Sequence, residues 1–154
     1  TQEPLKDEFV LTAISNATRT WDDQVSGELF TPGVADYSAV YGNLDGKNSI
    51  AFSNYKDPKV IAITTVWYYR STGQIIESDM LFNEYWTWGA AESDGSQMDL
   101  QNIATHEFGH VIGLDDLYTD SCKEVTMYGY SSLEEVKNRT LDPSDIAAIQ
   151  KIYG

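Results

Sequence analysis

The stretch Ala104–Asp116, with the sequence ATHEFGHVIGLDD, contains both histidines of the chain and decides how the rest is interpreted. His106 and His110 are four residues apart, so on a helix they lie one turn apart on the same face. Two imidazoles in this relation can bind one metal ion, and Glu107 beside them can act on a metal-bound water.

A turn after this helix can supply a third ligand. Gly113 gives a place where the helix can end and the chain can turn back. Asp116 follows His110 by six residues and can supply this ligand, with the neighbouring Asp115 as its rival. The alternative is a core helix whose two histidines are merely hydrogen-bonded, and the added Gly113 and Asp116 disfavour it.

The predicted helix spans residues 100–112. Asp99 is a plausible N-cap because its side chain can accept a hydrogen bond from the first turn. One face carries an apolar stripe, and the two histidines lie off it. The stripe is formed by Leu100, Ile103, Ala104, Phe108 and Val111.

Periodicity predicts further elements on the N-terminal side. Apolar residues at spacings of three and four predict a helix over residues 5–21, with Pro4 in its first turn. Alternating and β-branched residues predict strands over residues 49–53, 60–69 and 74–83, the last two paired as a hairpin. Residues 84–98 are predicted to be a loop.

The C-terminal part is irregular until a final helix within residues 141–154. Asp142 can cap this helix, Pro143 suits its first position, and Asp145 places negative charge at its positive end. Before it, Met127 stands in a segment without periodicity, where a gap-filling core methionine is one explanation.

Length and composition restrict the possible classes of protein. The chain of 154 residues is long enough for one domain with a sizeable core, and 42% of its residues are hydrophobic. Its formal charge of −14 disfavours nucleic acid and anionic membranes as partners. No apolar run is long enough to cross a membrane, and the single Cys122 excludes an internal disulfide framework.

The pattern HExxHxxGxxD resembles the zinc signature of the metzincin metallopeptidases. Most metzincins have histidine where this chain has Asp116, and the snapalysin family is similar in using aspartate there. The segment Thr126-Met127-Tyr128 and the last helix are closest to those of the matrixins, the matrix metalloproteinase family, although Gly129 stands where proline is usual.

This resemblance implies an α+β, zincin-like catalytic domain over residues 1–154, with an upper subdomain (1–113) and a small irregular lower one (114–154). A twisted mixed sheet of four or five strands would accompany two long helices. Met127 would lie in a tight turn under the metal, with Asp145 bracing that turn. The strand Glu77–Asn83 would edge the cleft and pair with an extended substrate.

The implied function is that of a zinc endopeptidase. His106, His110 and Asp116 would bind zinc, and Glu107 would activate the zinc-bound water for attack on a peptide bond. The resemblance also implies structural calcium. We expect a secreted, extracellular monomer, mature and without its signal peptide, that acts on polypeptides, binds no nucleic acid and does not insert into membranes. The alternatives are a catalytically silent metal-binding module that recognises peptides, and a snapalysin-like rather than matrixin-like peptidase.

Overall fold

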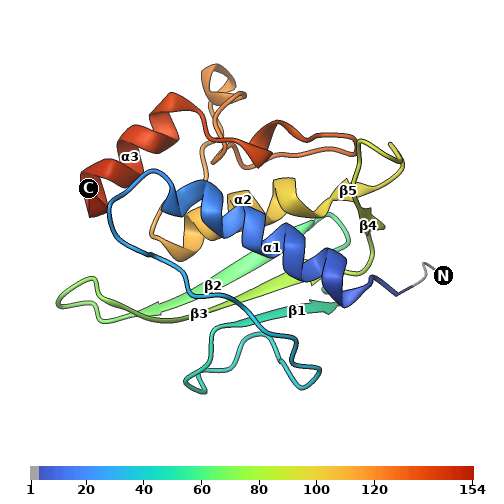
Figure 1. Ribbon diagram of the computed structural model, residues 1–154, viewed down its shortest axis with the longest axis horizontal. Coiled ribbons are helices and arrows are strands. Elements are labelled where there is room, and N and C mark those ends of the chain that lie inside the picture. The colour runs from blue at the N-terminus through green and yellow to red at the C-terminus, as the bar shows by residue number, and fades with distance from the viewer. Residues whose placement is uncertain (1–3) are drawn as a thin grey trace. The chain divides into compact units, whose positions relative to one another are not determined.

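The computed structural model describes residues 4–154, which form two compact units (Figure 1). The first unit combines the N-terminal segment through Ala35 with Thr87–Gly154, and the second is Asp36–Trp86. The mixture of three α-helices with a small mixed sheet confirms the α+β class for the described residues. Among these residues, no helix is both long enough and apolar enough to cross a membrane.

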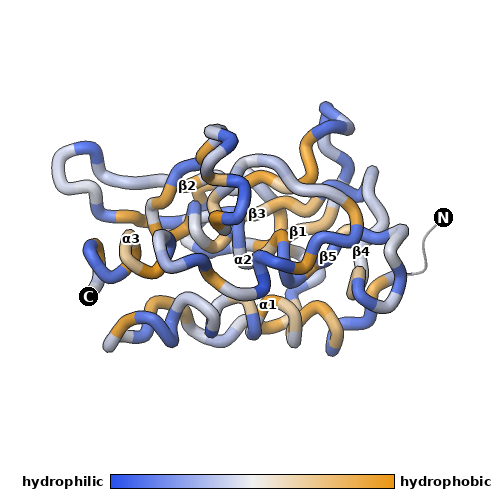
Figure 2. The backbone as a smooth tube through the Cα atoms, turned by 90° about the horizontal axis from the view of Figure 1, so that it is seen from above, coloured by the Kyte–Doolittle hydropathy of each residue, from blue (hydrophilic) through white to orange (hydrophobic). Residues whose placement is uncertain are grey.

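The first unit begins with helix α1 (Asp7–Asp22), which packs against α2 (Leu100–Val111). Figure 2 shows hydrophobic and hydrophilic residues alternating along α1, as expected for a helix with one buried face. At its C-terminal end the fully buried Trp21 donates a hydrogen bond from Nε1 to the carbonyl of Thr105 at 2.8 Å. The N-cap is Lys6, so Pro4 precedes the helix, and its predicted place in the first turn is wrong.

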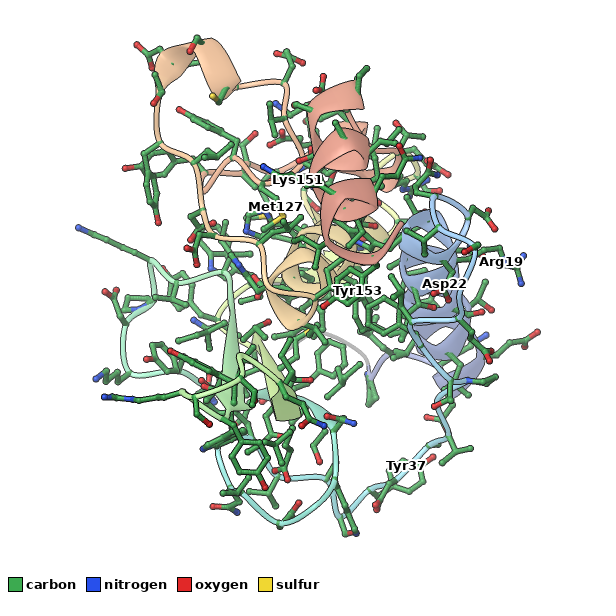
Figure 3. All side chains as sticks on the ribbon, turned by 90° about the vertical axis from the view of Figure 1, so that its left-hand side faces the viewer. Arg19, Asp22, Tyr37, Met127, Lys151 and Tyr153 are labelled. Atoms are coloured by element: carbon green, nitrogen blue, oxygen red, sulfur yellow. The ribbon has the colours of Figure 1, made fainter. Side chains whose placement is uncertain are left out.

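Helix α3 (Pro143–Tyr153) closes the chain and starts as predicted. Asp142 and Asp145 form a capping box that satisfies backbone N–H groups of the first turn. At the other end the hydroxyl of Tyr153 donates to the carbonyl of Ile112, where α2 ends, at 3.0 Å (Figure 3). The two helix ends are therefore tied together within this unit.

The rest of the first unit contains little regular structure. The predicted loop 84–98 includes a short parallel pair, β4 (Trp88–Gly89) and β5 (Met98–Asp99). Between α2 and α3 the only helical turns in this described stretch are two 3-10 turns, η1 (Asp120–Cys122) and η2 (Lys137–Arg139). An irregular segment was predicted there, because no periodicity marks it.

The second unit is a three-stranded sheet in the order β1–β3–β2, with bounds Ser49–Ser53, Ala62–Tyr68 and Ile75–Asn83 for β1, β2 and β3. The β2–β3 pair is the predicted antiparallel hairpin, and β1 runs parallel to β3. Strand β3 uses both of its edges for these pairings. The prediction that Glu77–Asn83 edges a cleft and pairs with substrate is therefore wrong. The expectation of four or five strands is also wrong, because this sheet has three strands in the described residues.

Two buried carboxylates of β3 bind the backbone of the loop of residues 42–49. This segment lies beside β3 without forming a further strand before β1. Asp79 accepts hydrogen bonds from the backbone N–H groups of Gly42 at 2.7 Å and Ser49 at 3.0 Å. Glu77 accepts from Gly46 at 2.6 Å. Both acids are at most 2% exposed, and these bonds compensate the cost of burying their charges.

Candidate metal centre

The N-terminus of α2 is fixed by the buried carboxylate of Asp99. Its side chain accepts a hydrogen bond from the backbone N–H of Asn102 at 2.8 Å, which confirms it as the N-cap. Arg139 donates to the same carboxylate from Nε at 2.9 Å and from Nη2 at 2.5 Å. The capping charge is thus neutralised by a two-pronged ion pair, which joins the start of α2 to the segment before α3.

The C-terminus of α2 ends in a Schellman turn. Gly113 adopts φ +96°, which favours glycine, and its N–H donates to the carbonyl of His110 at 3.0 Å. The N–H of Leu114 donates to the carbonyl of Gly109 at 2.9 Å. This turn reverses the chain directly after the second histidine.

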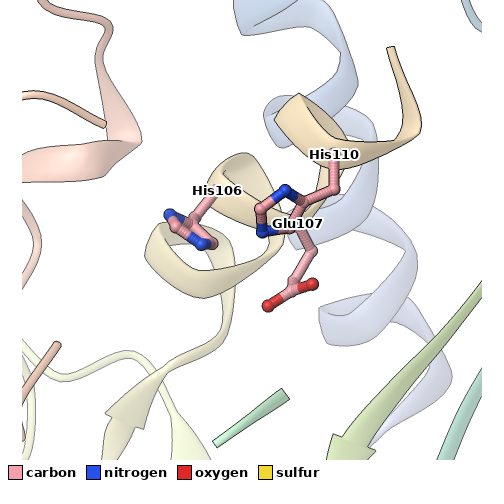
Figure 4. A group of neighbouring side chains, drawn as sticks. All are labelled: His106, Glu107 and His110. Carbon is pink, nitrogen blue, oxygen red and sulfur yellow. The ribbon is translucent and has the colours of Figure 1, made fainter. Parts of the chain in front are cut away.

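Both histidines are oriented by backbone carbonyls. Nδ1 of His106 lies 2.7 Å from the carbonyl oxygen of Thr126, and Nδ1 of His110 lies 2.8 Å from that of Leu114. Because a carbonyl only accepts, each Nδ1 must carry the proton, which leaves Nε2 with a free lone pair. The two rings extend from adjacent turns of α2 (Figure 4), with their centroids 4.8 Å apart.

Asp116 meets both histidines with one oxygen. Its Oδ1 lies 3.1 Å from Nε2 of His106 and 3.4 Å from Nε2 of His110. This oxygen is buried, yet neither contact has hydrogen-bond geometry. With both rings neutral, three atoms that carry lone pairs converge on one another, so the group is stabilised by a proton on an Nε2 atom or by a metal ion between them.

Such an arrangement fits a divalent metal ion. A carboxylate oxygen facing two imidazole lone pairs is stabilised only by positive charge between them or on the rings. Two histidines and one carboxylate are also the ligand set of many catalytic zinc sites, which keep a further position open. Hydrogen bonds to the outer atoms of metal-binding histidines, as in this site, set the tautomer that binds the ion.

The charges of the site affect all three groups. Burial by itself would lower the pKa of His106, but the carboxylates of Asp116 and Glu107 outweigh it and raise that pKa above its ordinary value. The same causes raise the pKa of His110 to about 9, and the two histidines lower the pKa of Asp116. Protons and a metal ion compete for the same lone pairs, so metal binding would release these protons.

Glu107 lies beside the histidines and is 5% exposed. His106, Glu107 and His110 each offer a ligand atom, and these atoms lie within 4.8 Å of one another. Asp115, by contrast, is exposed, and no hydrogen bond or ion pair of its side chain is found in the described part of the chain. The placement therefore favours Asp116 over Asp115 as the third ligand.

Met127 packs against α2 and is 2% exposed (Figure 3). It approaches α2 at Gly109, where an added Cβ would lie 2.2 Å from the sulfur of Met127 and 3.1 Å from Cζ2 of Trp21. A side chain at this position would therefore force Met127 to move. The sequence analysis did not single out Gly109, because the need for a glycine there arises from a residue 18 positions away.

Asp145 is connected to the site through Thr126. Oδ2 of Asp145 accepts a hydrogen bond from the backbone N–H of Thr126 at 2.8 Å, and the carbonyl of Thr126 lies against Nδ1 of His106. Asp145 and Thr126 are at most 3% exposed. A continuous path of buried hydrogen bonds therefore leads from the first turn of α3 to the first histidine.

Tyr118 was also missed by the sequence analysis. Its hydroxyl donates to Oδ2 of Asp116 at 3.0 Å, and its ring fills the space beside Gly129. An added Cβ on Gly129 would lie 2.4 Å from Cε1 of that ring. The only signal in the sequence was the glycine at a position where the resemblance led us to expect proline.

Comparison with known proteins agrees with this geometry. The sequence profile of the matrixin family matches residues 1–154. The chain is 33% identical to the hatching enzyme of Paracentrotus lividus, over 99% of the chain and 23% of that protein. It is 28% identical to matrilysin of Mus musculus, over 92% of the chain and 50% of that protein. It is 33% identical to stromelysin-3 of Homo sapiens, over 51% of the chain and 14% of that protein.

The chain spans at most half the length of these three relatives. The family implies zinc as the metal, and the cluster of His106, Glu107 and His110 offers a possible site for it. A match over its whole length shows that the chain belongs to the matrixin family of metallopeptidases.

Proposed function

We propose that this chain is a zinc-dependent endopeptidase that hydrolyses extended polypeptides. The observation that carries the proposal is the convergence of Oδ1 of Asp116 on Nε2 of both histidines, at 3.1 and 3.4 Å, with Glu107 beside them. These groups can supply what metal-assisted hydrolysis of a peptide bond uses: a place for a Lewis acid and a nearby carboxylate that can carry a proton.

His106, His110 and Asp116 would hold the ion. When bound, zinc supplies a Lewis acid that makes water more acidic and polarises a substrate carbonyl. Glu107 accepts the proton of the attacking water and delivers it to the leaving amine. Glu107 is 5% exposed, so little of this residue contacts bulk solvent.

The aspartate at the third position changes the charge of the site. Three neutral histidines would leave the charge of the ion at +2, whereas two histidines and an aspartate leave about +1. A lower charge weakens the pull on water and therefore raises the pH at which water is activated. This feature distinguishes the proposed site from the commoner metzincin set of three histidines.

The wider setting is part of the same proposal. Residues 1–154 would form one catalytic domain, with residues 1–113 and 114–154 as its two subdomains. The protein would act outside the cell as a monomer, consistent with the relatives named above and with the formal charge of −14. Structural calcium would accompany zinc, and the abundance of carboxylates supports this without identifying the ligands.

A single experiment tests the activity. Cleavage of casein and of a fluorogenic peptide library is measured for wild type with and without a chelator, together with zinc content. The chelator should abolish cleavage, and added zinc should restore it. Glu107→Ala should lower activity by at least ~10²-fold, with zinc still bound at about one ion per chain. Glu8→Ala, which removes an exposed helical glutamate, is the matched control and should behave as wild type.

The outcomes separate the candidate functions. Near-normal turnover by Glu107→Ala would refute the role of Glu107 in proton transfer. Tight zinc binding by wild type with no cleavage of any substrate would instead support a catalytically silent peptide-recognition module.

A further inference from the structure

The two oxygens of Asp116 have different partners. Oδ1 is buried and faces the two histidines, whereas Oδ2 accepts the hydroxyl hydrogen of Tyr118 at 3.0 Å. A carboxylate can bind zinc through one oxygen or through both, and it can rotate between these modes. A hydrogen bond to one oxygen selects the other for the metal.

Tyr118 completes a set of three outer partners. The outer atom of His106 is held by the carbonyl of Thr126, and that of His110 by the carbonyl of Leu114. An aspartate has no N–H with which to use such a carbonyl, so it needs a donor instead. The hydroxyl of Tyr118 is the donor that Asp116 has in this structure.

The position of the Tyr118 ring is fixed although the side chain is 58% exposed. On one side the ring contacts Gly129, where a Cβ would lie 2.4 Å from Cε1 and 2.8 Å from Cζ. On another side the ring of Tyr130 packs edge-on, with the centroids 5.3 Å apart. The preceding Leu117 is held by backbone hydrogen bonds to Met127 at 2.8 Å and to Gly129 at 2.9 Å.

We infer that Tyr118 is a positioning residue, which holds Asp116 so that a single oxygen faces the metal, and that Gly129 is required because it makes room for the Tyr118 ring. This inference rests on the proposed function, since it assumes that Asp116 binds zinc. It also gives a physical reason for two departures from the family pattern in one place: an aspartate third ligand needs an added donor, and the donor's ring needs a glycine.

The test compares Tyr118→Phe, which keeps the ring and removes only the hydroxyl, with Tyr130→Phe. Tyr130 is in the same aromatic cluster, and no hydrogen bond of its hydroxyl is found in the described structure. Zinc affinity is measured by competition with a chromophoric chelator at pH 7. Tyr118→Phe should raise the zinc Kd about tenfold or more, as loss of partners to metal ligands does. Tyr130→Phe should leave the Kd within about twofold, which is small beside the tenfold effect.

A spectrum provides a readout that a merely structural role would not change. The visible absorption of the cobalt(II)-substituted chain reports the number and geometry of ligands. It should differ from wild type in Tyr118→Phe and remain the same in Tyr130→Phe. The unfolding midpoint of the metal-free chain should change little in either variant, because the rings and their packing are kept and the hydrogen bond lost in Tyr118→Phe is exposed to solvent.

Gly129→Ala tests the second half of the inference. The added methyl should displace the Tyr118 ring and weaken zinc binding as Tyr118→Phe does. In the Tyr118→Phe background the same substitution should have less than about twofold further effect, because the bond it disturbs is already absent.

The failures are distinguishable. If the zinc Kd or the cobalt spectrum of Tyr118→Phe equals that of wild type while Asp116→Ala weakens zinc binding strongly, this inference is overturned and the proposed function stands. If wild type binds no zinc, both are overturned. If Asp116→Ala leaves the Kd unchanged, Asp116 is not the third ligand and this inference is overturned, while the proposed function is judged by the cleavage assay.

Discussion

Replacing Asp145 by alanine tests whether the last helix supports His106, one of the proposed zinc ligands. Oδ2 of Asp145 accepts two backbone N–H groups, from Thr126 at 2.8 Å and from Asp142 at 3.2 Å. The first of these groups is buried, since Thr126 is 1% exposed. In Asp145→Ala the N–H of Thr126 would lose its acceptor in a place that water does not reach.

The expected loss of stability follows from these two bonds. A hydrogen bond to a charged group contributes about 1.5–3 kcal/mol, and one half of a helix cap contributes about 1 kcal/mol. The free energy of unfolding should therefore fall by about 2.5–4 kcal/mol. For a chain of this size each kcal/mol lowers the midpoint by about 2–4 °C, so the thermal midpoint should fall by about 5–15 °C.

The measurement is urea and thermal unfolding of the metal-free chain, followed by zinc affinity in the folded protein. Asp145→Asn keeps an oxygen for Thr126 and should recover part of the loss. Asp120→Ala is the control, because its 88% exposed carboxylate makes only a surface ion pair with Lys123. The carbonyl of Thr126 also orients His106, so the zinc Kd of Asp145→Ala should rise about tenfold. A variant as stable as Asp120→Ala, with the zinc affinity of wild type, would refute the reasoning.

Four further predictions concern the site and its support. Asp116→Ala should weaken zinc binding by far more than tenfold, whereas the zinc affinity of Asp115→Ala should stay within about tenfold of wild type; equal zinc affinity in wild type and Asp116→Ala, with a loss only in Asp115→Ala, would transfer the ligand role to Asp115. If water acidity limits the wild type, metal-loaded Asp116→His should show an acid limb of its pH–activity profile at lower pH, because the site gains positive charge. Gly109→Ala should destabilise the chain by about 1–2 kcal/mol, since overpacking against Met127 costs about 1–3 kcal/mol and helix propensity returns up to about 1 kcal/mol; a higher unfolding midpoint would contradict this. In the metal-free chain the pKa of His110 is raised from 6.5 to about 9, so its contribution to stability is complete below pH 6.5 and is lost as the pH rises to about 9; urea midpoints measured across that range should fall, and a rise would contradict the assignment.

Local patterns were sufficient to predict most elements of the fold. The helix predicted over residues 100–112 is Leu100–Val111, and the strand predicted over residues 49–53 is Ser49–Ser53. The N-cap of this helix at Asp99 and the turn after it at Gly113 depend on residues adjacent in sequence, which is why they could be predicted. The family signature added the ligand set, which no periodicity could supply.

The features that were missed depend on contacts between distant residues. Nothing within Glu77–Asn83 indicates that a strand will be paired on both sides, because this depends on where β1 returns. The need for glycine at Gly109 and Gly129 comes from the side chains of Met127 and Tyr118. Such close approaches become visible only when three-dimensional positions are known.

The loop of residues 42–48 is held by its backbone, and this has a consequence for protein engineering. Glu77 and Asp79 bind its amide groups, while the side chains of residues 42–48 are exposed. The loop can therefore carry foreign side chains at Asn43, Leu44 and Lys47 without losing its anchors, provided that the two glycines with positive φ, Gly42 and Gly46, are kept. It is a natural position for displaying a short recognition epitope or a fluorescent label on this protein.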